Sequence, residues 1–324
     1  MPQSGFPPKD WTPGTIGQFL TFIVPAPDGC NLKCPFCFIA QRQEITATHL
    51  SPEDYVRFIE GIAEVEPVAG VAIQGYEPLL PEALPYTAAI LRNAGALGLP
   101  SSLVTNGIEL RVSLPLLRQL RPDRVGVSLD AATARRHDKL RGKQGAWQAT
   151  VGAIAHSIAP LARAGTQLTV ISVLMPGRRA DLDAMPALLS QIGVQDWIVN
   201  PLTVIKSDRW ADSDAGRRLP EDLLALAERA REHGVALTVD DEFGLLQSAL
   251  PALRSLRREG VMIRSLPEGI TLSRLTPGGQ CSVGRQIAGR MPLGMPRWTA
   301  ASLHPVLFLQ AQRTGSIFQA RAAG

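Results

Sequence analysis

The sequence is poor in cysteine, in aromatic residues and in net charge, and each shortage excludes a class of protein. Four cysteines in 324 residues are too few for a disulfide scaffold. Aromatic residues make up 5% and the formal net charge is only +4, so we expect no nucleic-acid partner. No apolar run reaches the about 18–20 residues of a membrane span. The N-terminus also lacks the basic start and apolar run of a signal peptide. We therefore expect a cytoplasmic protein with no membrane partner.

The hydrophobic share of the sequence, 45%, is ordinary for a globular chain with a sizeable core. Short β-rich runs alternate with segments of helical period, which predicts strand–helix–strand units with right-handed crossovers and a parallel sheet. The predicted strands are 18–25, 68–74, 102–105, 124–129, 167–174, 197–202 and 235–239. The predicted helices are 52–65 (with Ser51 as N-cap), 81–97, 147–164, 181–192 and 220–233. This pattern predicts an α/β fold, a partial (β/α)6-type barrel.

The alternating pattern weakens after residue 242, where a predicted helix at 245–257 precedes a tail rich in proline and methionine. We expect an N-terminal extension (1–17), the partial barrel (18–242), and a C-terminal extension (243–324) that carries Cys281 and packs on the barrel. In parallel barrels the chemistry lies at the C-terminal ends of the strands. The unusual residues of this sequence lie at those ends.

Three of the four cysteines, Cys30, Cys34 and Cys37, follow the first predicted strand within eight residues. Thiolates at this spacing can converge on one metal centre. A structural zinc site needs a fourth protein ligand, which would be His49 or Cys281. An iron–sulfur cube can instead leave one iron open to a non-protein ligand. Three inert buried cysteines are a further alternative, although reactivity explains clustered cysteines better than packing does.

The spacing Cys-x-x-x-Cys-x-aromatic-Cys after the first strand of a barrel resembles the radical S-adenosylmethionine superfamily, over roughly residues 18–240. The resemblance implies that Cys30, Cys34 and Cys37 hold a [4Fe–4S] cluster. It also implies that the open iron binds the methionine part of S-adenosyl-L-methionine. Phe36 matches the aromatic position near the adenine of that cofactor.

Further segments match the superfamily's cofactor-binding positions in the same order. Gly75-Tyr76-Glu77-Pro78, after the second predicted strand, resembles the Gly-Gly-Glu-Pro segment that binds the cofactor's amino group. Tyr76 replaces one glycine, which could alter that contact, and Glu77 is the expected ligand. The resemblance implies ribose or carboxylate contacts for five more residues: Thr105, Asn106, Ser128, Asp130 and Arg141.

Three of these residues have structural alternatives. Asn106-Gly107 could be only a turn, and Asp130 could be the N-cap of the next helix. Arg141 could be a partner in a surface salt bridge. The sequence leaves each pair of readings open.

The superfamily's chemistry implies an external one-electron reductant of flavodoxin or ferredoxin type, and a 5′-deoxyadenosyl radical that takes hydrogen from the substrate. Cys281 is the one cysteine outside the motif, so no second four-thiolate cluster can form. A thiol can instead return hydrogen to a carbon radical and invert the stereocentre. The flanking glycines favour an exposed turn around Cys281, and a buried apolar cysteine is the alternative.

This layout resembles the radical epimerases that act on aminoglycosides, which implies an isomerase of antibiotic biosynthesis. Asp240, Asp241 and Glu242 end the seventh predicted strand and could hold a cationic sugar through charge-assisted hydrogen bonds. A solvated acidic turn is the alternative. A second hypothesis is a radical dehydrogenase, dehydratase or decarboxylase acting on a sugar, aminocyclitol or nucleoside intermediate, for which Cys281 would be dispensable. A third is a non-enzymatic metal-binding module that engages a partner.

Overall fold

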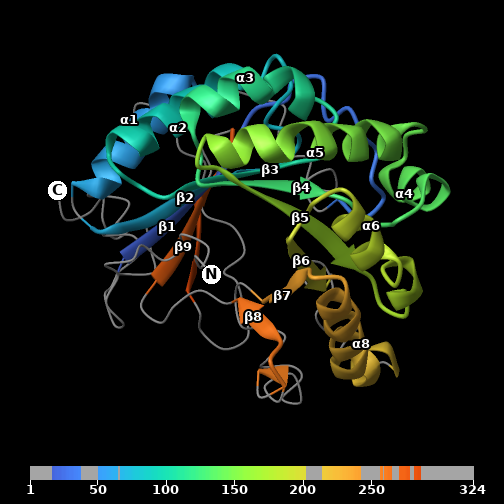
Figure 1. The fold of residues 1–324 in the computed structure, drawn as a ribbon. Helices are drawn as coiled ribbons and strands as arrows, with labels where there is room; N and C mark the ends of the chain where they lie inside the picture. The colour runs from blue at the N-terminus through green and yellow to red at the C-terminus, as the bar shows by residue number, and fades with distance from the viewer. Residues whose placement is uncertain are drawn as a thin grey trace. The chain divides into compact units, whose positions relative to one another are not determined.

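The structure is a computed structural model that describes residues 17–37, 50–64, 66–201, 214–241, 256–257, 259–264, 270–277 and 281–285. The chain forms two compact units. Unit 1 comprises Met1–Gly29, Arg42–Leu103 and Pro267–Gly324, and unit 2 comprises Cys30–Gln41 and Val104–Leu266. Figure 1 shows the elements of both units. The predicted segments 1–17, 18–242 and 243–324 stay predictions.

Unit 1 contains a sheet whose described strands follow the order β10-β9-β1-β2-β3. Strands β9, β1, β2 and β3 run parallel, and β10 pairs antiparallel with β9. The strand bounds are β1 Gly17–Ile23, β2 Val68–Gln74, β3 Ser101–Thr105, β9 Ile270–Leu275 and β10 Cys281–Arg285, and the last two residues of β3 belong to unit 2. Strands β9 and β10 belong to the predicted C-terminal extension, so part of that extension is built into this sheet.

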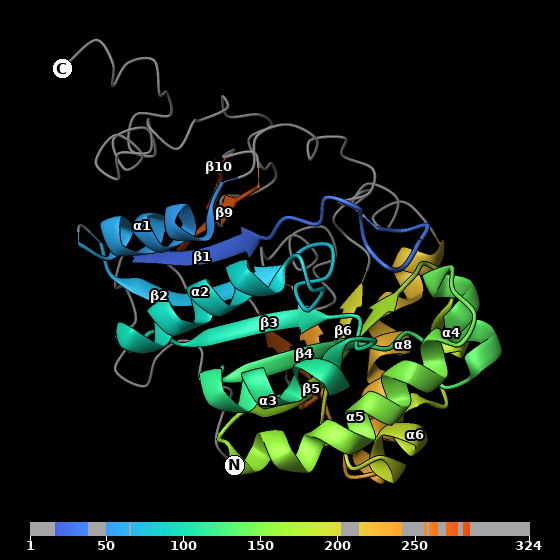
Figure 2. The ribbon, with the colours of Figure 1, turned by 90° about the horizontal axis from the view of Figure 1, so that it is seen from above.

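Helices α1 (Pro52–Ala63) and α2 (Leu84–Ala96) pack on the strands of unit 1 (Figure 2). Ser51 caps α1 as predicted: its hydroxyl accepts a hydrogen bond from the backbone N–H of Asp54, and the Asp54 carboxylate accepts one from the Ser51 N–H. The buried ring of Tyr55 stands edge-on to Phe22 of β1, with centroids 5.6 Å apart. The Tyr55 hydroxyl donates to the carbonyl oxygen of Ile23, so α1 is fixed to the end of β1.

Unit 2 contains the parallel strands β4 to β8 in sequence order. Their bounds are β4 Arg124–Ser128, β5 Gln167–Leu174, β6 Asp196–Pro201, β7 Ala236–Asp240 and β8 Met262–Arg264. The helices are α3 Leu110–Leu120, α4 Ala134–Arg141, α5 Ala146–Arg163, α6 Met185–Gln191 and α8 Asp214–Glu232, with a 3-10 turn at Arg179–Asp181. No helix in the described residues is long and apolar enough to span a membrane.

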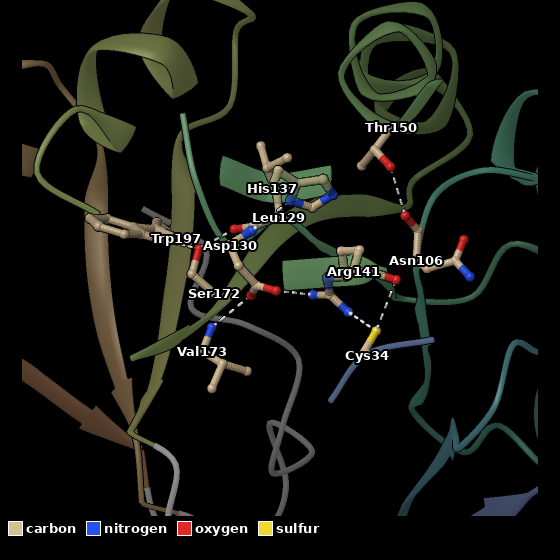
Figure 3. Close-up of polar contacts among 10 residues, drawn as sticks. All are labelled: Cys34, Asn106, Leu129, Asp130, His137, Arg141, Thr150, Ser172, Val173 and Trp197. Carbon is tan, nitrogen blue, oxygen red and sulfur yellow. Dashed lines mark hydrogen bonds and ion pairs between the residues drawn. The ribbon is translucent and has the colours of Figure 1, made fainter. Parts of the chain in front are cut away.

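The carboxyl end of β4 is fixed by a buried polar contact with the neighbouring strands. Trp197 of β6 is fully buried, and its indole N–H donates to the Ser172 hydroxyl at 2.9 Å. That hydroxyl donates in turn to the carbonyl oxygen of Leu129 (Figure 3). The segment that follows β4 therefore leaves the sheet from a fixed position.

The predicted strands lie within a few residues of β1 to β7, whereas α3 and α4 were not predicted. Pro115 lies inside α3, and a proline argues against a helix interior. Helix α4 carries mostly charged side chains, so its sequence lacks the apolar stripe by which a helix is recognised. The predicted helix at 245–257 lies almost wholly outside the described residues.

Candidate functional site

The cysteine loop, residues 30–37, contains three half-buried cysteines, none of which forms a disulfide. No three Cys, His, Asp or Glu side chains in the described residues are placed to hold a single metal ion. A cubane cluster does not require that convergence, because each thiolate binds a different iron atom. His49, one predicted fourth ligand of a zinc site, lies outside the described residues.

The loop is fastened to the C-terminal end of α4 by its backbone. The Lys33 N–H donates to the carbonyl oxygen of Arg141 at 3.1 Å. Gly142 then caps the helix in the left-handed region, with φ +66°. A Cβ atom at this position would overlap the Lys33 carbonyl oxygen and lie 3.0 Å from the carbonyl carbon. The close approach of the helix end to the loop therefore requires glycine.

Arg141 is the side chain that links this helix end to the cysteines (Figure 3). One guanidinium nitrogen, Nη2, lies 2.7 Å from a carboxylate oxygen of Asp130, and Nη1 lies 3.8 Å from the sulfur of Cys34. The guanidinium carbon stands 5.6 Å from the centroid of the Phe36 ring. Arg141 is buried, so the prediction of a surface salt bridge is wrong.

Asp130 anchors Arg141 to the sheet. Its side chain is 1% exposed, and Oδ1 accepts a hydrogen bond from the Val173 N–H of β5 at 2.9 Å. The N-cap of α4 is Thr133, so the prediction that Asp130 caps the next helix is wrong. Burial raises the pKa of the Asp130 carboxyl, and the Arg141 cation opposes that shift. Burial likewise raises the pKa of the Cys34 thiol, and Arg141 again favours the charged form.

His137 of α4 is fully buried, and its Nδ1 accepts a hydrogen bond from the Asp130 N–H at 3.2 Å. Burial, followed by the nearby Arg141 cation, lowers the pKa of His137 to about 3. Because an unfolded histidine titrates near 6.5, the unfolded chain binds the extra proton between about pH 3 and 6.5. The stabilising effect of this group is complete above pH 6.5 and is lost as the pH falls toward 3.

We therefore expect His137→Asn to flatten the acid side of the stability profile. The free energy of unfolding of the unmodified protein should fall, relative to the variant, by up to about 1.4 kcal/mol per pH unit below pH 6.5. Urea unfolding at a series of pH values measures this difference, with His156→Asn as the control because His156 is exposed. Parallel profiles for the unmodified protein and His137→Asn would show that His137 becomes protonated in the folded state.

Asn106, after β3, contacts the first cysteine of the loop. Its amide nitrogen donates to the Asn31 side-chain oxygen at 2.7 Å and lies 3.8 Å from the Cys30 sulfur. Its side-chain oxygen accepts the Ile108 N–H, so the predicted turn is also present. The Thr150 hydroxyl of α5 donates a hydrogen bond to the Asn106 backbone carbonyl oxygen at 2.9 Å. Asn106 therefore both closes its own turn and reaches the cysteine loop.

The donor set of the loop fits an iron–sulfur cluster. Three thiols lie on one short segment, and the Arg141 cation beside Cys34 favours the thiolate that ligation requires. The side-chain nitrogen of Asn31, next to Cys30, is buried and has no hydrogen-bond partner among the residues that the structure describes. A buried donor of this kind favours an acceptor beside it, and cluster sulfurs are acceptors of hydrogen bonds.

The predicted cofactor segment of unit 1 is a tight turn at the carboxyl end of β2. Gly75 has φ +127°, a backbone conformation that side chains rarely adopt. Glu77 is fully buried, and its carboxylate accepts the Leu79 N–H at 3.1 Å. The Thr87 hydroxyl of α2 donates to the Pro78 carbonyl oxygen and fixes the turn. Tyr76, in the place of a glycine, is half-buried.

Two further predicted residues lie at the strand ends of unit 2. Thr105 is buried, and its hydroxyl accepts the Gly107 N–H at 3.0 Å. Ser128 is the last residue of β4 and is half-buried. Both lie at carboxyl ends of strands, as the sequence predicted.

Asp240 and Asp241 are not in a solvated turn, so that alternative is wrong for both. The Asp240 carboxylate accepts hydrogen bonds from the Arg264 guanidinium at 3.0 and 3.2 Å and from the Asn200 amide at 3.2 Å. Asp241 is buried, and its N–H donates to the Arg264 carbonyl oxygen. Arg264 therefore balances the Asp240 charge that was predicted to meet a cationic substrate. Glu242 lies outside the described residues.

Cys281 is the first residue of β10, opposite Leu275 of β9. The expected turn at Cys281 is therefore wrong, and the sequence missed this strand because the glycines before and after Cys281 are typical of loops. Sequence reasoning also missed Asn31, Gly142 and Val173 as parts of the cysteine site. Of these, Gly142 had a usable signal, because glycine directly after a basic helical turn is typical of a helix C-terminus.

The part of the chain that contains the cysteine loop also resembles known proteins. Residues 24–181 match the Radical SAM superfamily. Over 128 residues the chain is 34% identical to the AdoMet-dependent heme synthase of Methanosarcina barkeri, covering 39% of this chain and 35% of that protein. Over 179 residues it is 32% identical to the GTP 3′,8-cyclase of Streptomyces coelicolor, covering 52% and 48%. The chain thus spans about half or less of the length of these relatives.

Among solved structures, the chain resembles SuiB of Streptococcus suis bound to its precursor peptide SuiA. The TM-score is 0.62 at 16% identity, over 90% of this chain and 64% of SuiB. It also resembles anSMEcpe with bound AdoMet and a peptide, with a TM-score of 0.51 at 15% identity, over 76% of this chain and 63% of that one. These likenesses confirm the predicted fold class, an α/β partial barrel of the radical SAM type.

Proposed function

We propose, on the premise that residues 24–181 are a Radical SAM superfamily domain, that the chain is a radical SAM enzyme. The predicted cofactors, a [4Fe–4S] cluster and S-adenosyl-L-methionine, are those that this superfamily uses. The observation that carries the proposal is the cysteine loop, in which three thiols lie on one short segment with the buried Arg141 cation beside Cys34. When bound, the cluster and the cofactor supply a 5′-deoxyadenosyl radical that removes hydrogen from a C–H bond.

The chain's own residues would hold these groups as follows. Cys30, Cys34 and Cys37 would ligate three irons. Glu77, buried at the end of β2, would accept a hydrogen bond from the cofactor's amino group. Gly75 and Tyr76 belong to the same turn as Glu77 and are proposed to contact that amino group. Phe36 is proposed to lie near the adenine. Contacts with the ribose or the carboxylate are proposed for Thr105, Asn106, Ser128, Asp130 and Arg141.

For the fate of the substrate radical we propose epimerisation, with Cys281 giving a hydrogen atom to carbon. The thiyl radical left on Cys281 would be restored to the thiol by one electron from the external reductant and one proton from water. The support is the cysteine count: three thiols belong to the loop, and the one that remains cannot form a second four-thiolate cluster that would take an electron. The S–H bond is weaker than a sugar C–H bond, so transfer of hydrogen to carbon runs downhill. The relatives named above are a heme synthase and a GTP 3′,8-cyclase, and neither is named as an epimerase. A dehydrogenase, dehydratase or decarboxylase is the second candidate.

The proposed substrate is a cationic sugar or aminoglycoside, and the proposed electron donor is a flavodoxin- or ferredoxin-type protein. The acidic residues proposed to meet the cation are Asp240, Asp241 and Glu242, of which Asp240 already pairs with Arg264. Substrate binding that weakens as salt rises would support this proposal, because exposed charge pairs are screened.

Turnover in deuterated water tests the epimerase proposal. The full chain, reconstituted anaerobically and reduced, should release 5′-deoxyadenosine with a suitable aminoglycoside and place deuterium at the inverted centre, because the Cys281 S–H exchanges with solvent. Cys281→Ala should still release 5′-deoxyadenosine but form epimer at least about tenfold more slowly, a barrier increase of ~1.4 kcal/mol.

Cys281→Ser is the matched control, since it keeps the size of the side chain but has a stronger bond to hydrogen. It should behave as Cys281→Ala does. Epimer formed at the unmodified rate by either variant would remove the donor role and favour the second candidate.

A further inference from the structure

We propose that Arg141, held by Asp130, is a positioning residue for the cluster ligand Cys34, and that it raises the reduction potential of the cluster. The inference rests on the proposed function, because it assumes that the cysteine loop binds the cluster. It differs from the cofactor contact predicted for Arg141 from the sequence. In this structure the guanidinium is already engaged by a carboxylate and a thiol.

The first support is that the cation is anchored to the sheet. Asp130 follows β4, and its two carboxylate oxygens have separate partners: Oδ1 accepts the Val173 N–H of β5 at 2.9 Å, and Oδ2 faces Arg141 Nη2 at 2.7 Å. Both side chains are at most 9% exposed. A buried and doubly fixed carboxylate leaves the guanidinium little freedom to turn away from Cys34.

The second support is that Arg141 contacts the loop at three places. Its Nη1 lies 3.8 Å from the Cys34 sulfur, its carbonyl oxygen accepts the Lys33 N–H, and its guanidinium stands over the Phe36 ring. Figure 3 shows the continuous path from Val173 through Asp130 and Arg141 to Cys34. One residue therefore fixes the backbone before Cys34, the sulfur itself and the aromatic ring that follows.

The effect on potential follows from charge. Reduction adds an electron to the cluster, and a cation or N–H donor beside a ligating sulfur stabilises the more negative state. Burial strengthens that interaction, because the local dielectric constant is lower than that of water. The Arg141 cation lies 3.8 Å from the Cys34 sulfur and acts on the pKa of that thiol more strongly than the Asp130 carboxylate does, so the cation's effect exceeds that of its carboxylate partner.

The test compares the cluster's midpoint potential, by anaerobic redox titration, in the full-length reconstituted protein and three variants. Arg141→Gln should shift the potential to more negative values and lower the iron bound per chain. The double variant Asp130→Asn/Arg141→Gln should also shift it negative, but by less, because the opposing carboxylate is gone. Arg141→Lys keeps the charge and should recover part of the shift.

The double variant also separates an electrostatic role from a structural one. Removing one partner of a buried pair leaves an unpaired charge, whereas a neutral amide pair avoids it. The double variant should therefore regain stability relative to Arg141→Gln while its potential stays below that of the unmodified protein. If Arg141→Gln fails to fold, the midpoint potential of the double variant still tests the proposal.

The control is Arg136→Gln. Arg136 lies on α4, as Arg141 does, and its guanidinium forms an ion pair with Asp181 at 2.6 Å. Arg136 has no described contact with the loop. The variant's potential should equal that of the unmodified protein. A double variant with an unchanged potential, or a shift as large in Arg136→Gln, would overturn the inference. If the unmodified protein binds no cluster at all, the proposed function fails instead, and the two failures are distinct.

Discussion

Replacing Cys37 with alanine is expected to abolish cluster binding. The loop has three thiols, and the fourth iron of the proposed cluster binds the cofactor. Each thiol is therefore needed as a ligand. Iron and acid-labile sulfide per chain after anaerobic reconstitution should fall to near background. The visible charge-transfer absorption and 5′-deoxyadenosine release should disappear with them.

Cys281→Ala is the matched control, because it removes one thiol outside the loop by the same substitution. It should keep the iron content and the absorption of the unmodified protein. Equal loss of iron from both variants would indicate that Cys281 is a ligand, which is one of the two fourth ligands, His49 or Cys281, that the zinc alternative allowed. Full iron content and activity in Cys37→Ala would contradict the assignment of the loop.

Gly142→Ala is expected to have the second largest effect, on stability and on cluster assembly together. The left-handed backbone at this residue costs an L-residue about 1–2 kcal/mol. Its Cβ would also overlap the Lys33 carbonyl oxygen, and relief of such overpacking costs a further ~1–3 kcal/mol. To remove this overlap, the backbone before Cys34 must move. We therefore expect both iron uptake and the free energy of unfolding to fall.

Gly145→Ala separates the cost of the backbone conformation from that of the steric overlap. Gly145 also has a positive φ, +80°, but a Cβ atom there meets nothing within 4 Å. It should show only the backbone cost of about 1–2 kcal/mol and unchanged iron uptake. Urea unfolding and iron analysis of both variants make the comparison. Equal losses of stability and of iron uptake in the two variants would mean that the close contact between Gly142 and Lys33 does not position the cysteine loop.

The sequence was sufficient to predict the parts of the fold and site that depend on local pattern. Seven strands follow from short apolar runs, and the N-cap at Ser51 follows from a serine directly before a segment of helical period. The cysteine loop was recognisable because its spacing is itself local. Helix α4 was not predicted, because its charged sequence is stabilised by what its ends contact and not by an apolar stripe.

The partners of the site residues could not be predicted, because they depend on distances between segments far apart in the chain. Arg141 and Cys34 are 107 positions apart, and nothing in either local sequence indicates their contact. The same holds for Asp240, whose charge is met by Arg264 of another strand. Residue type suggested a free acidic site there, and the pairing of β7 with β8 supplies the cation that balances it.

Electron paramagnetic resonance of the reduced protein, with and without the cofactor, tests whether the loop holds a [4Fe–4S] cluster with one iron open to S-adenosyl-L-methionine. We expect a reduced-cluster signal whose line shape changes when the cofactor binds, because the cofactor reaches an iron without a thiolate. A zinc-loaded protein without such a signal, or a cluster signal that the cofactor leaves unchanged, would contradict this expectation.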